Sequence, residues 1–207
     1  MIEYKTVTAD FTGFYEEKKS RFIATLHPVT TEEEALEFIN KMKKQYWDAR
    51  HNCSAYIIGA DNPIERSSDD GEPSRTAGLP MLEVLKGAEL RNVCLVVTRY
   101  FGGVLLGTGG LVRAYQSAAK DAVANTQVLT CRQMNRVVFT IDYTAYGKLQ
   151  YIATGEGLTV ENTDFSDSVN VTMLLDDSQL KSVTKKITEI TSGSCTVDNL
   201  GKYWVLV

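Results

Sequence analysis

The sequence predicts an α+β protein with two domains, residues 1–130 and 131–207. One observation is the apolar run at residues 93–97, followed by a glycine-rich stretch and then by apolar residues at helical spacing. This succession is typical of a buried strand, a loop and a helix. The second observation is that strand and helix patterns from residue 136 onward alternate in the order β-α-β-β-α-β. That order predicts a ferredoxin-like C-terminal domain.

The N-terminal segment predicts a β-hairpin. Residues 4–13 and 20–28 alternate enough to be strands, and we expect residues 13–19 to join them. Near this turn lies a basic group of three residues, Lys18, Lys19 and Arg21. The group is a candidate phosphate contact, although the more common role of such a cluster is to face water at the end of a strand.

A helix follows, with Thr30 or Thr31 as its N-cap. Glutamates occupy positions 32–34, where acidic side chains suit the positive end of the helix dipole. Apolar residues at helical spacing predict the face that packs on the sheet: Leu36, Ile39, Met42 and Trp47.

Residues 51–59, HNCSAYIIG, predict a strand on which His51 and Cys53 point to the same face. A Cys–His pair can act as nucleophile and base. Two residues on one strand give poor geometry for that reaction, and no third orienting group is evident. We therefore expect His51 to hydrogen-bond the acidic segment that follows.

The long loop predicted at residues 61–79 carries Asp69, Asp70 and Glu72, and long ordered loops are often functional. Three carboxylates could ligate a hard divalent cation, but their spacing is not that of an EF-hand. The alternative that we favour is turn formation together with pairing to Arg75, Arg99 or Arg113. We accordingly expect neither a metal ion nor another cofactor. Pro80 then opens a short helix over residues 81–86.

The stretch from Thr98 to Tyr115 reads TRYFGGVLLGTGGLVRAY and contains five glycines, at positions 102, 103, 107, 109 and 110. Arg99 ends the strand and Arg113 enters the helix, which we expect to end at Asn125. A helix N-terminus beside cationic side chains favours an anion. The spacing is neither GxGxxG nor GxxxxGK[ST], so a tight turn whose glycines permit close packing stays an equal alternative. Tyr100 is a candidate for stacking on a base, whereas we expect Phe101 to pack in the core.

The C-terminal domain has clear periodicity. Strands are predicted at residues 136–142, 157–160, 168–175 and 203–207, with helices at 143–155 and from Asp176 or Asp177 to Ile190. This domain contains no histidine and no cluster of acid, base and nucleophile. We therefore expect it to dock and not to catalyse.

Composition narrows the class of protein. A formal net charge of −4 argues against bulk nonspecific nucleic-acid binding but not against a local basic patch. The four cysteines lack CxxC pairing, as is usual in a reducing cytosol, so we expect a cytoplasmic protein. The chain has no apolar run of the ~18 residues that a membrane span needs. Its first residues also lack the features of a signal peptide.

Two blocks resemble the signature of the YigZ/IMPACT family: SDDGEPS followed by TAG, and RYFGG followed by LGTGGLVRAY. The stretch His51-Asn52-Cys53 followed by Ala55-Tyr56 is similar to the strand that precedes the acidic loop in that family. Arg75 is a departure, because the family usually has a small residue there, often glycine. The resemblance is strong over residues 14–125, and the remainder fits the smaller C-terminal domain of bacterial YigZ-like members by pattern only.

The resemblance implies an N-terminal domain like ribosomal protein S5 domain 2, followed by the ferredoxin-like domain. Relatives of both occur in tandem in ribosomal translocation factors. The family's eukaryotic members are associated with translational regulation through the activator of a stress kinase. For bacterial members, the family implies a nucleic-acid or ribosome-binding role, and some carry a peptidase label.

We therefore expect a cytosolic binding protein that docks on RNA, the ribosome or a translation-associated protein partner through a groove between the acidic and glycine-rich segments. The alternative is an enzyme, a metal-assisted hydrolase or peptidase that uses the acidic loop and His51. The candidate binding residues are His51, Asp69, Asp70, Glu72, Arg75, Arg99, Tyr100, Gly102, Gly103, Gly107, Gly109, Gly110 and Arg113.

Overall fold

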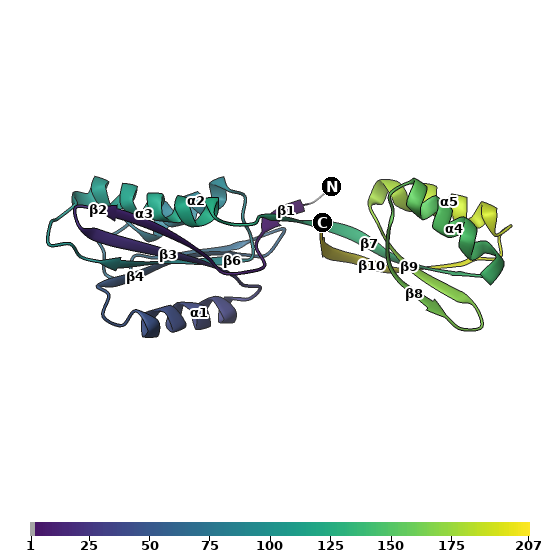
Figure 1. The fold of residues 1–207 in the computed structure, drawn as a ribbon, viewed down its shortest axis with the longest axis horizontal. Helices are drawn as coiled ribbons and strands as arrows, with labels where there is room; N and C mark the ends of the chain where they lie inside the picture. The colour runs from purple at the N-terminus through teal and green to yellow at the C-terminus, as the bar shows by residue number, and fades with distance from the viewer. Residues whose placement is uncertain (1–2) are drawn as a thin grey trace. The chain divides into compact units, whose positions relative to one another are not determined.

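The computed structural model describes residues 3–207, which divide into two compact units. The larger unit is Tyr4–Thr130, and the smaller unit is Cys131–Val207 together with Glu3. Each unit has its own antiparallel sheet and its own hydrophobic core, with helices packed on the sheet (Figure 1). The predicted mixture of helices and sheets is therefore confirmed. No helix in the described part of the chain is long and apolar enough to cross a membrane.

The sheet of the larger unit is built around one central strand. Its strand order is β2-β3-β6-β4-β5, and each neighbouring pair is antiparallel. The strands are β2 (Phe11–Glu17), β3 (Ser20–Pro28), β4 (His51–Ile58), β5 (Ile64–Ser68) and β6 (Val93–Tyr100), and a short β1 (Glu3–Thr6) precedes them. Because β6 lies in the middle, it is buried from Val93 to Arg99.

Helices cover both faces of this sheet (Figure 1). One face carries α1 (Glu32–Gln45), and the other carries α2 (Gly78–Gly87) and α3 (Gly107–Ala124). Side chains of β6 point alternately to the two faces of the sheet. Leu95 and Val97 pack toward α2 and α3, while Cys94 and Val96 pack toward α1. The continuous apolar run in the sequence is thus explained by burial on both sides of the strand.

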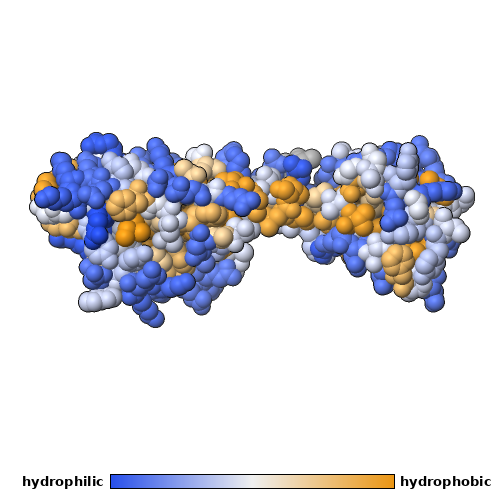
Figure 2. Space-filling model, viewed as in Figure 1, coloured by the Kyte–Doolittle hydropathy of each residue, from blue (hydrophilic) through white to orange (hydrophobic). Residues whose placement is uncertain are grey.

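The outer side of α1 corrects one prediction. Thr31 is the N-cap, and its hydroxyl accepts a hydrogen bond from the N–H of Glu34, as predicted. Leu36 and Trp47, however, are 52% and 81% exposed, so they do not belong to the packing face. Hydrophilic residues prevail along the margin of the unit where α1 lies (Figure 2).

The hairpin is longer than predicted, because β2 extends through Gly13 to Glu17 and only Lys18 and Lys19 form the turn. Gly13 is needed inside the strand: a Cβ added there would lie 2.1 Å from the backbone nitrogen of Ala122 in α3. The turn residues Lys18 and Lys19 have φ of 48° and 65°, the pair of positive values typical of a two-residue hairpin loop.

Three further predicted boundaries were wrong. The stretch 61–79 is not all loop, because it contains the edge strand β5. Helix α2 begins at Gly78, two residues before Pro80. Helix α3 begins at Gly107, so the last three glycines of the glycine-rich stretch form its first turn and are not part of a loop. The predicted end of α3 is confirmed, with Asn125 as the C-cap.

The smaller unit has two helices on one face of its sheet, in which β10, β7, β9 and β8 are neighbours in that order and β1 also pairs with β7 (Figure 1). The predicted β-α-β-β-α-β succession is confirmed. Its elements are β7 (Leu129–Ile141), α4 (Tyr143–Gly155), β8 (Thr159–Phe165), β9 (Val169–Leu175), α5 (Asp177–Ile190) and β10 (Thr196–Leu206). Strands β7, β8 and β10 are longer than predicted, which leaves only residues 166–168 for the turn between β8 and β9.

Candidate functional site

A cavity of about 360 Å³ lies in the larger unit, where the acidic segment meets the glycine-rich stretch. We call it the Glu72 cavity. Its lining joins the start of β4, residues 71–73, the end of β6 and the start of α3. The polar side chains on it are those of Arg50, His51, Glu72, Arg99 and Thr108, and the apolar ones are those of Pro73, Phe101, Leu105, Leu106 and Leu111. Clefts that combine apolar walls with a few convergent polar groups are typical ligand sites.

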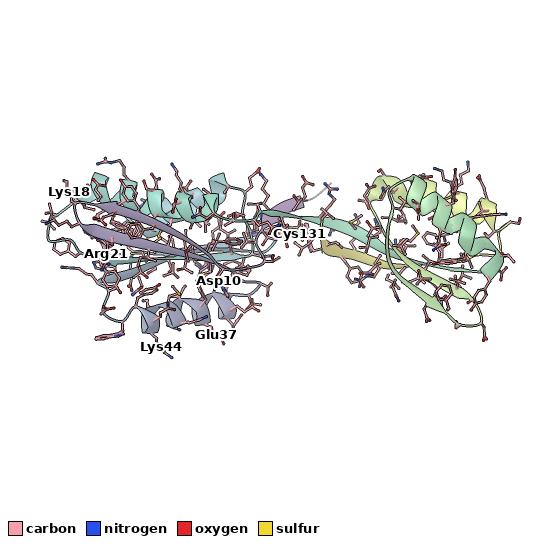
Figure 3. All side chains as sticks on the ribbon, in the orientation of Figure 1. Asp10, Lys18, Arg21, Glu37, Lys44 and Cys131 are labelled. Carbon is pink, nitrogen blue, oxygen red and sulfur yellow. The ribbon has the colours of Figure 1, made fainter. Side chains whose placement is uncertain are left out.

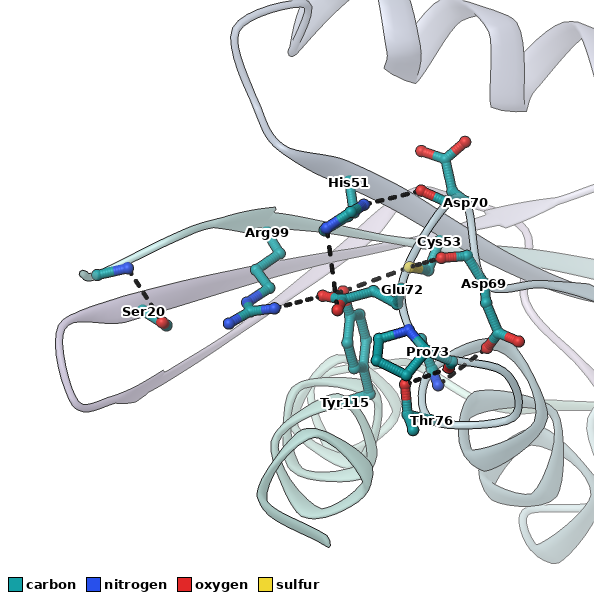
Figure 4. A network of polar contacts seen from close by, with 12 residues as sticks. Ser20, His51, Cys53, Asp69, Asp70, Glu72, Pro73, Thr76, Arg99 and Tyr115 are labelled. Carbon is teal, nitrogen blue, oxygen red and sulfur yellow. Dashed lines mark hydrogen bonds and ion pairs between the residues drawn. The ribbon is translucent and has the colours of Figure 1, made fainter. Parts of the chain in front are cut away.

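A buried ion pair forms the polar side of this cavity (Figure 4). Oε1 of Glu72 lies 2.6 Å from Nη1 of Arg99 and accepts a second hydrogen bond, of 2.8 Å, from the Tyr115 hydroxyl. The Glu72 and Arg99 side chains are 3% and 6% exposed. Removing one partner of such a pair costs roughly 3–5 kcal/mol, because the other charge stays buried and uncompensated.

His51 holds the acidic segment in place, as the sequence predicted. Its Nδ1 lies 2.8 Å from the carbonyl oxygen of Asp70, and a carbonyl can only accept, so Nδ1 carries the proton. On the other side of the ring, Nε2 lies 3.9 Å from Oε2 of Glu72.

Cys53 lies behind this network and is fully buried. Its Sγ lies 3.0 Å from the carbonyl oxygen of Asp69 and 3.3 Å from the Tyr115 hydroxyl (Figure 4). Burial raises the pKa of the Cys53 thiol well above its usual range, and it does the same for the Tyr115 phenol. This environment favours the thiol over the nucleophilic thiolate.

The three carboxylates of the acidic segment have three separate structural roles. The Asp69 carboxylate accepts hydrogen bonds from the backbone N–H groups of Arg75, Ala77 and Gly78, the last two at 3.0 and 2.8 Å, and so caps α2. Asp70 accepts from the backbone N–H of Asn52 and pairs with Lys43 at 2.6 Å. Across residues 3–207, no group of three His, Cys, Asp or Glu side chains is placed to hold a metal ion.

Arg75 pairs with this segment through its backbone and not through its guanidinium. Its N–H lies 2.7 Å from Oδ2 of Asp69, and its φ is 63°, in the left-handed region that favours glycine. Glycine would adopt this conformation without the steric cost that a Cβ adds. Of the three predicted partners of the acids, Arg75, Arg99 or Arg113, it is Arg99 whose guanidinium pairs with an acid of this segment, Glu72.

Gly102 serves packing. A Cβ added there would lie 2.1 Å from the backbone carbon of Lys19, and its N–H donates to the Ser20 hydroxyl at 3.1 Å. The glycine-rich stretch thus contacts the hairpin turn, the end of the unit where Lys18 and Arg21 lie (Figure 3). Close packing, one of the two alternatives for the glycines, holds at this position.

The first turn of α3 has features of the other alternative, an anion-binding site. Its N-cap residue, Leu106, provides no side-chain acceptor for the N–H groups of that turn. Nη1 of Arg113 would lie 3.6 Å from a Cβ placed on Gly109, so the guanidinium lies beside the same turn. No carboxylate of the described chain pairs with Arg113. A helix N-terminus without a cap, next to a free guanidinium, is suited to an anion.

The structure brings together only part of the predicted site. His51, Glu72, Arg99 and Gly107 line the Glu72 cavity, and Gly109, Gly110 and Arg113 lie in or beside the first turn of α3. Outside the cavity lining are Asp69, Asp70, Arg75, Tyr100, Gly102 and Gly103. The Tyr100 hydroxyl donates to Asp48 at 2.9 Å, and the guanidinium of Arg21 lies over its ring.

Sequence reasoning missed Arg50, Thr108 and Tyr115. Arg50 directly precedes β4, and its guanidinium lies 5.2 Å from the ring centre of Phe101. Phe101 is 38% exposed, so its predicted place in the core was wrong. Nothing in the helical spacing of Tyr115 reveals that its hydroxyl meets Glu72.

Comparison with known proteins agrees with the sequence signature. The Impact N-terminal domain matches residues 18–123, and a domain of unknown function, DUF1949, matches residues 139–194. The chain is 42% identical to "IMPACT family member YvyE" of Bacillus subtilis (strain 168) over 180 residues, which is 87% of this chain and 83% of that protein. It is 35% identical to "IMPACT family member YigZ" of Escherichia coli (strain K12), covering 90% of this chain and 92% of that protein.

Two further matches cover different shares of the chain. "Protein IMPACT" of Oryctolagus cuniculus is 35% identical over 96 residues, which is 44% of this chain and 30% of that protein. A solved structure titled "Crystal structure of an hypothetical protein" is similar with a TM-score of 0.63 at 31% identity, and it covers 95% of this chain and 97% of its own.

Proposed function

The chain belongs to the IMPACT family, and from this premise we propose that it is a translation-linked regulatory protein. In this proposal it binds RNA, alone or within the ribosome, through the Glu72 cavity and the adjoining first turn of α3. A translation-associated protein is the other partner that the family resemblance implies. The proposal concerns the larger unit, which contains the segment matched by the Impact N-terminal domain.

The observation that carries the proposal is the open N-terminus of α3 beside Arg113. Unsatisfied N–H groups and the helix dipole attract phosphate, and a guanidinium can bind it through two parallel hydrogen bonds. Arg99 is a weaker candidate for phosphate binding than the sequence predicted, because the Glu72 carboxylate neutralises its charge. Arg50 and Arg113 are therefore the cations that we expect to meet phosphate.

The small number of free cations sets the expected salt dependence. Each phosphate that a protein neutralises on a single strand contributes about −0.7 to the slope of log K against log salt. Two phosphate contacts would therefore weaken binding roughly sevenfold between ~50 and ~200 mM salt. A protein with a net charge of −4 should show this local, modest dependence and not the steep one of a basic nucleic-acid-binding domain.

The experiment is cosedimentation of the full chain with ribosomes from its own source at those two salt concentrations. Arg113→Ala should weaken binding severalfold and flatten the salt dependence. Lys120→Ala is the matched control, since Lys120 is an exposed cation on the same helix but far from its first turn. Absence of wild-type cosedimentation at low salt would refute ribosome binding, and equal losses from both variants would refute the role of the α3 N-terminus.

A hydrolase is the second candidate, favoured by the approach of His51 and Glu72 at the cavity wall. His51 would act as the proton carrier, and Glu72 would orient it. The separate roles of Asp69 and Asp70 weaken this candidate, because neither is free to ligate a catalytic metal ion. Hydrolysis of peptides or phosphate esters by the wild type, abolished in His51→Ala, would establish it in place of the binding function.

We also infer the fold types that the family resemblance implies. The strand order β10-β7-β9-β8, with both helices on one face, supports a ferredoxin-like smaller unit. For the larger unit, the family match over residues 18–123 supports the fold of ribosomal protein S5 domain 2. These assignments agree with a protein that docks on the translation machinery, although fold alone does not determine function.

A further inference from the structure

The smaller unit has a free sheet edge at β8. In the described chain β8 pairs with β9 alone, so its other edge carries backbone N–H and C=O groups without a strand partner (Figure 1). A β-bulge between Val160 and Asn162 interrupts the strand, and residues 162–165 form its regular part. Of the devices that protect sheet edges, β8 has this bulge but no lysine or proline. The edge can therefore accept one more strand.

A groove of about 600 Å³ lies beside this edge, between β8 and α4. Val160 and Thr163 line it from the strand, and Tyr146, Gly147 and Tyr151 line it from the helix. Two of these side chains are largely in solvent, Val160 with 41% and Tyr151 with 82% of its surface exposed. Extended peptides bind to such places, because the sheet edge pairs with their main chain and the pocket receives alternate side chains.

Gly147 is the least expected residue on the wall of the groove. A glycine inside a helix is less stable there than alanine. Neither packing nor conformation in the described chain requires it, because a Cβ added at Gly147 would have no atom within 4 Å and its φ is not positive. A helix wall without side chains is suited to the close approach of another chain.

The register of β8 on β9 determines which side chains an added strand would meet. Phe165 is opposite Val169, which is buried under the helices, so Phe165 lies on the helix side of the sheet. Asp164 is opposite Asn170 and lies on the other side. An added strand would therefore place one set of side chains at the groove and the alternate set beside Asp164.

The segment around β8 is acidic. Residues 149–180 contain no lysine, arginine or histidine but six carboxylates, at Glu156, Glu161, Asp164, Asp167, Asp176 and Asp177. Glu161 pairs with Arg136, whereas Asp164 and Asp167 form no ion pair with any of residues 3–207. A second copy of β8 on this edge would bring like charges together, which is unfavourable. Charge complementarity therefore favours a basic partner.

We propose that the edge of β8 and the adjoining groove bind an extended, basic segment of a partner protein as an additional strand. The side chains of this segment alternate in character. Apolar ones enter the groove between Gly147 and Val160, and lysines or arginines lie beside Asp164 on the opposite side of the sheet. The proposal concerns the smaller unit and does not depend on the RNA binding proposed for the larger unit.

The test is fluorescence anisotropy of a labelled peptide of alternating lysine and valine, KVKVKVKVK, with the full chain. The block peptide KKKKKVVVV has the same composition without the alternation, and EVEVEVEVE has the alternation with the opposite charge. We expect the alternating lysine peptide to bind at least about tenfold more tightly than either. Equal affinity for the two lysine peptides would indicate nonspecific attraction and overturn the proposal, as would no binding at about 1 mM.

Two pairs of variants locate the binding. Gly147→Leu fills the groove from an open position on α4, so the unit should fold and lose at least about tenfold in affinity. Its control is Thr144→Leu, exposed on the same helix outside the groove lining. Asp164→Asn should weaken binding about two- to fivefold, and Asp198→Asn on β10 should not. An affinity that Gly147→Leu leaves unchanged would overturn the proposal.

Backbone methylation tests strand addition itself. Alternate residues of an extended strand direct their N–H groups to the same side, so N-methylation of all lysines or of all valines removes these groups from one side only. One methylated peptide should lose binding and the other should keep it, and equal effects of the two would overturn strand pairing. Dimerisation of the chain in sedimentation velocity, abolished by Gly147→Leu, would assign the edge to a second copy and also overturn the proposal.

Discussion

Arg75 occupies a backbone conformation that costs stability, and replacing it with glycine should recover part of that cost. Its φ is 63°, where an L-residue with a Cβ is disfavoured by roughly 1–2 kcal/mol. Glycine removes this cost but gives the unfolded chain more freedom, worth about 0.5–1 kcal/mol. The difference predicts that Arg75→Gly stabilises the larger unit by about 0.5–1 kcal/mol. The bond from its N–H to Asp69 belongs to the backbone and remains.

Scanning calorimetry of the full chain would measure this effect on the transition of the larger unit. For a unit of this size, the gain corresponds to an increase in Tm of about 2–4 °C. Arg75→Ala is the matched control, because it removes the exposed guanidinium but keeps the Cβ. We expect no gain from alanine. An alanine variant as stable as the glycine variant would show that the charge and not the backbone conformation is responsible, and a destabilised glycine variant would refute the argument outright.

Three other predictions follow from packing and burial. Gly102→Ala should destabilise the larger unit by at least ~1–3 kcal/mol in thermal melts, because its Cβ would overlap the Lys19 backbone. The control is Gly147→Ala on α4, which has open space around it and should be neutral or stabilising in the same measurement. Iodoacetamide near pH 8 should leave the buried Cys53 unmodified in the native protein and label the partly exposed Cys195, as mass spectrometry would show; equal labelling would contradict the burial of Cys53. Burial and Glu32 raise the pKa of Tyr56 from 10 to about 12, so the native state holds this proton more tightly and the associated stability, complete below pH 10, is lost as pH rises toward 12. Denaturant titrations between pH 10 and pH 12 should show a smaller loss of unfolding free energy in Tyr56→Phe than in the wild type. An equal loss in the two proteins would contradict this prediction.

The sequence was most informative where local chemistry determines local structure. The helix that follows Asp176 has a capping box between that residue and Gln179, and it ends at Ile190 as predicted. Helix α4 has the predicted bounds because its periodicity is clear between strands. The buried run of β6 was found because a central strand is apolar on both faces.

The failures of prediction came from contacts between distant segments. Strand β5, with the sequence IERSS, is mostly exposed and forms only because β4 is its neighbour, so no apolar alternation reveals it. The same limit applied to the site. Glu72 meets Arg99 and Tyr115 across 27 and 43 residues of sequence. Pairing of the acids with Arg99 was among the predicted alternatives, but no sequence pattern showed that Glu72 is the acid or that Tyr115 joins the pair.

The two helices that pack side by side on the sheet, α2 and α3, differ in how their first turns are satisfied. Asp69 acts for α2 as a resident anion, with its carboxylate on the first N–H groups. The N-cap residues themselves, Ala77 in α2 and Leu106 in α3, provide no acceptor, and in the described chain no carboxylate from another segment does for α3 what Asp69 does for α2. A single carboxylate at position 106 would provide such an anion. Whether a helix end is closed or open therefore depends, in this protein, on whether a neighbouring segment brings a carboxylate to it.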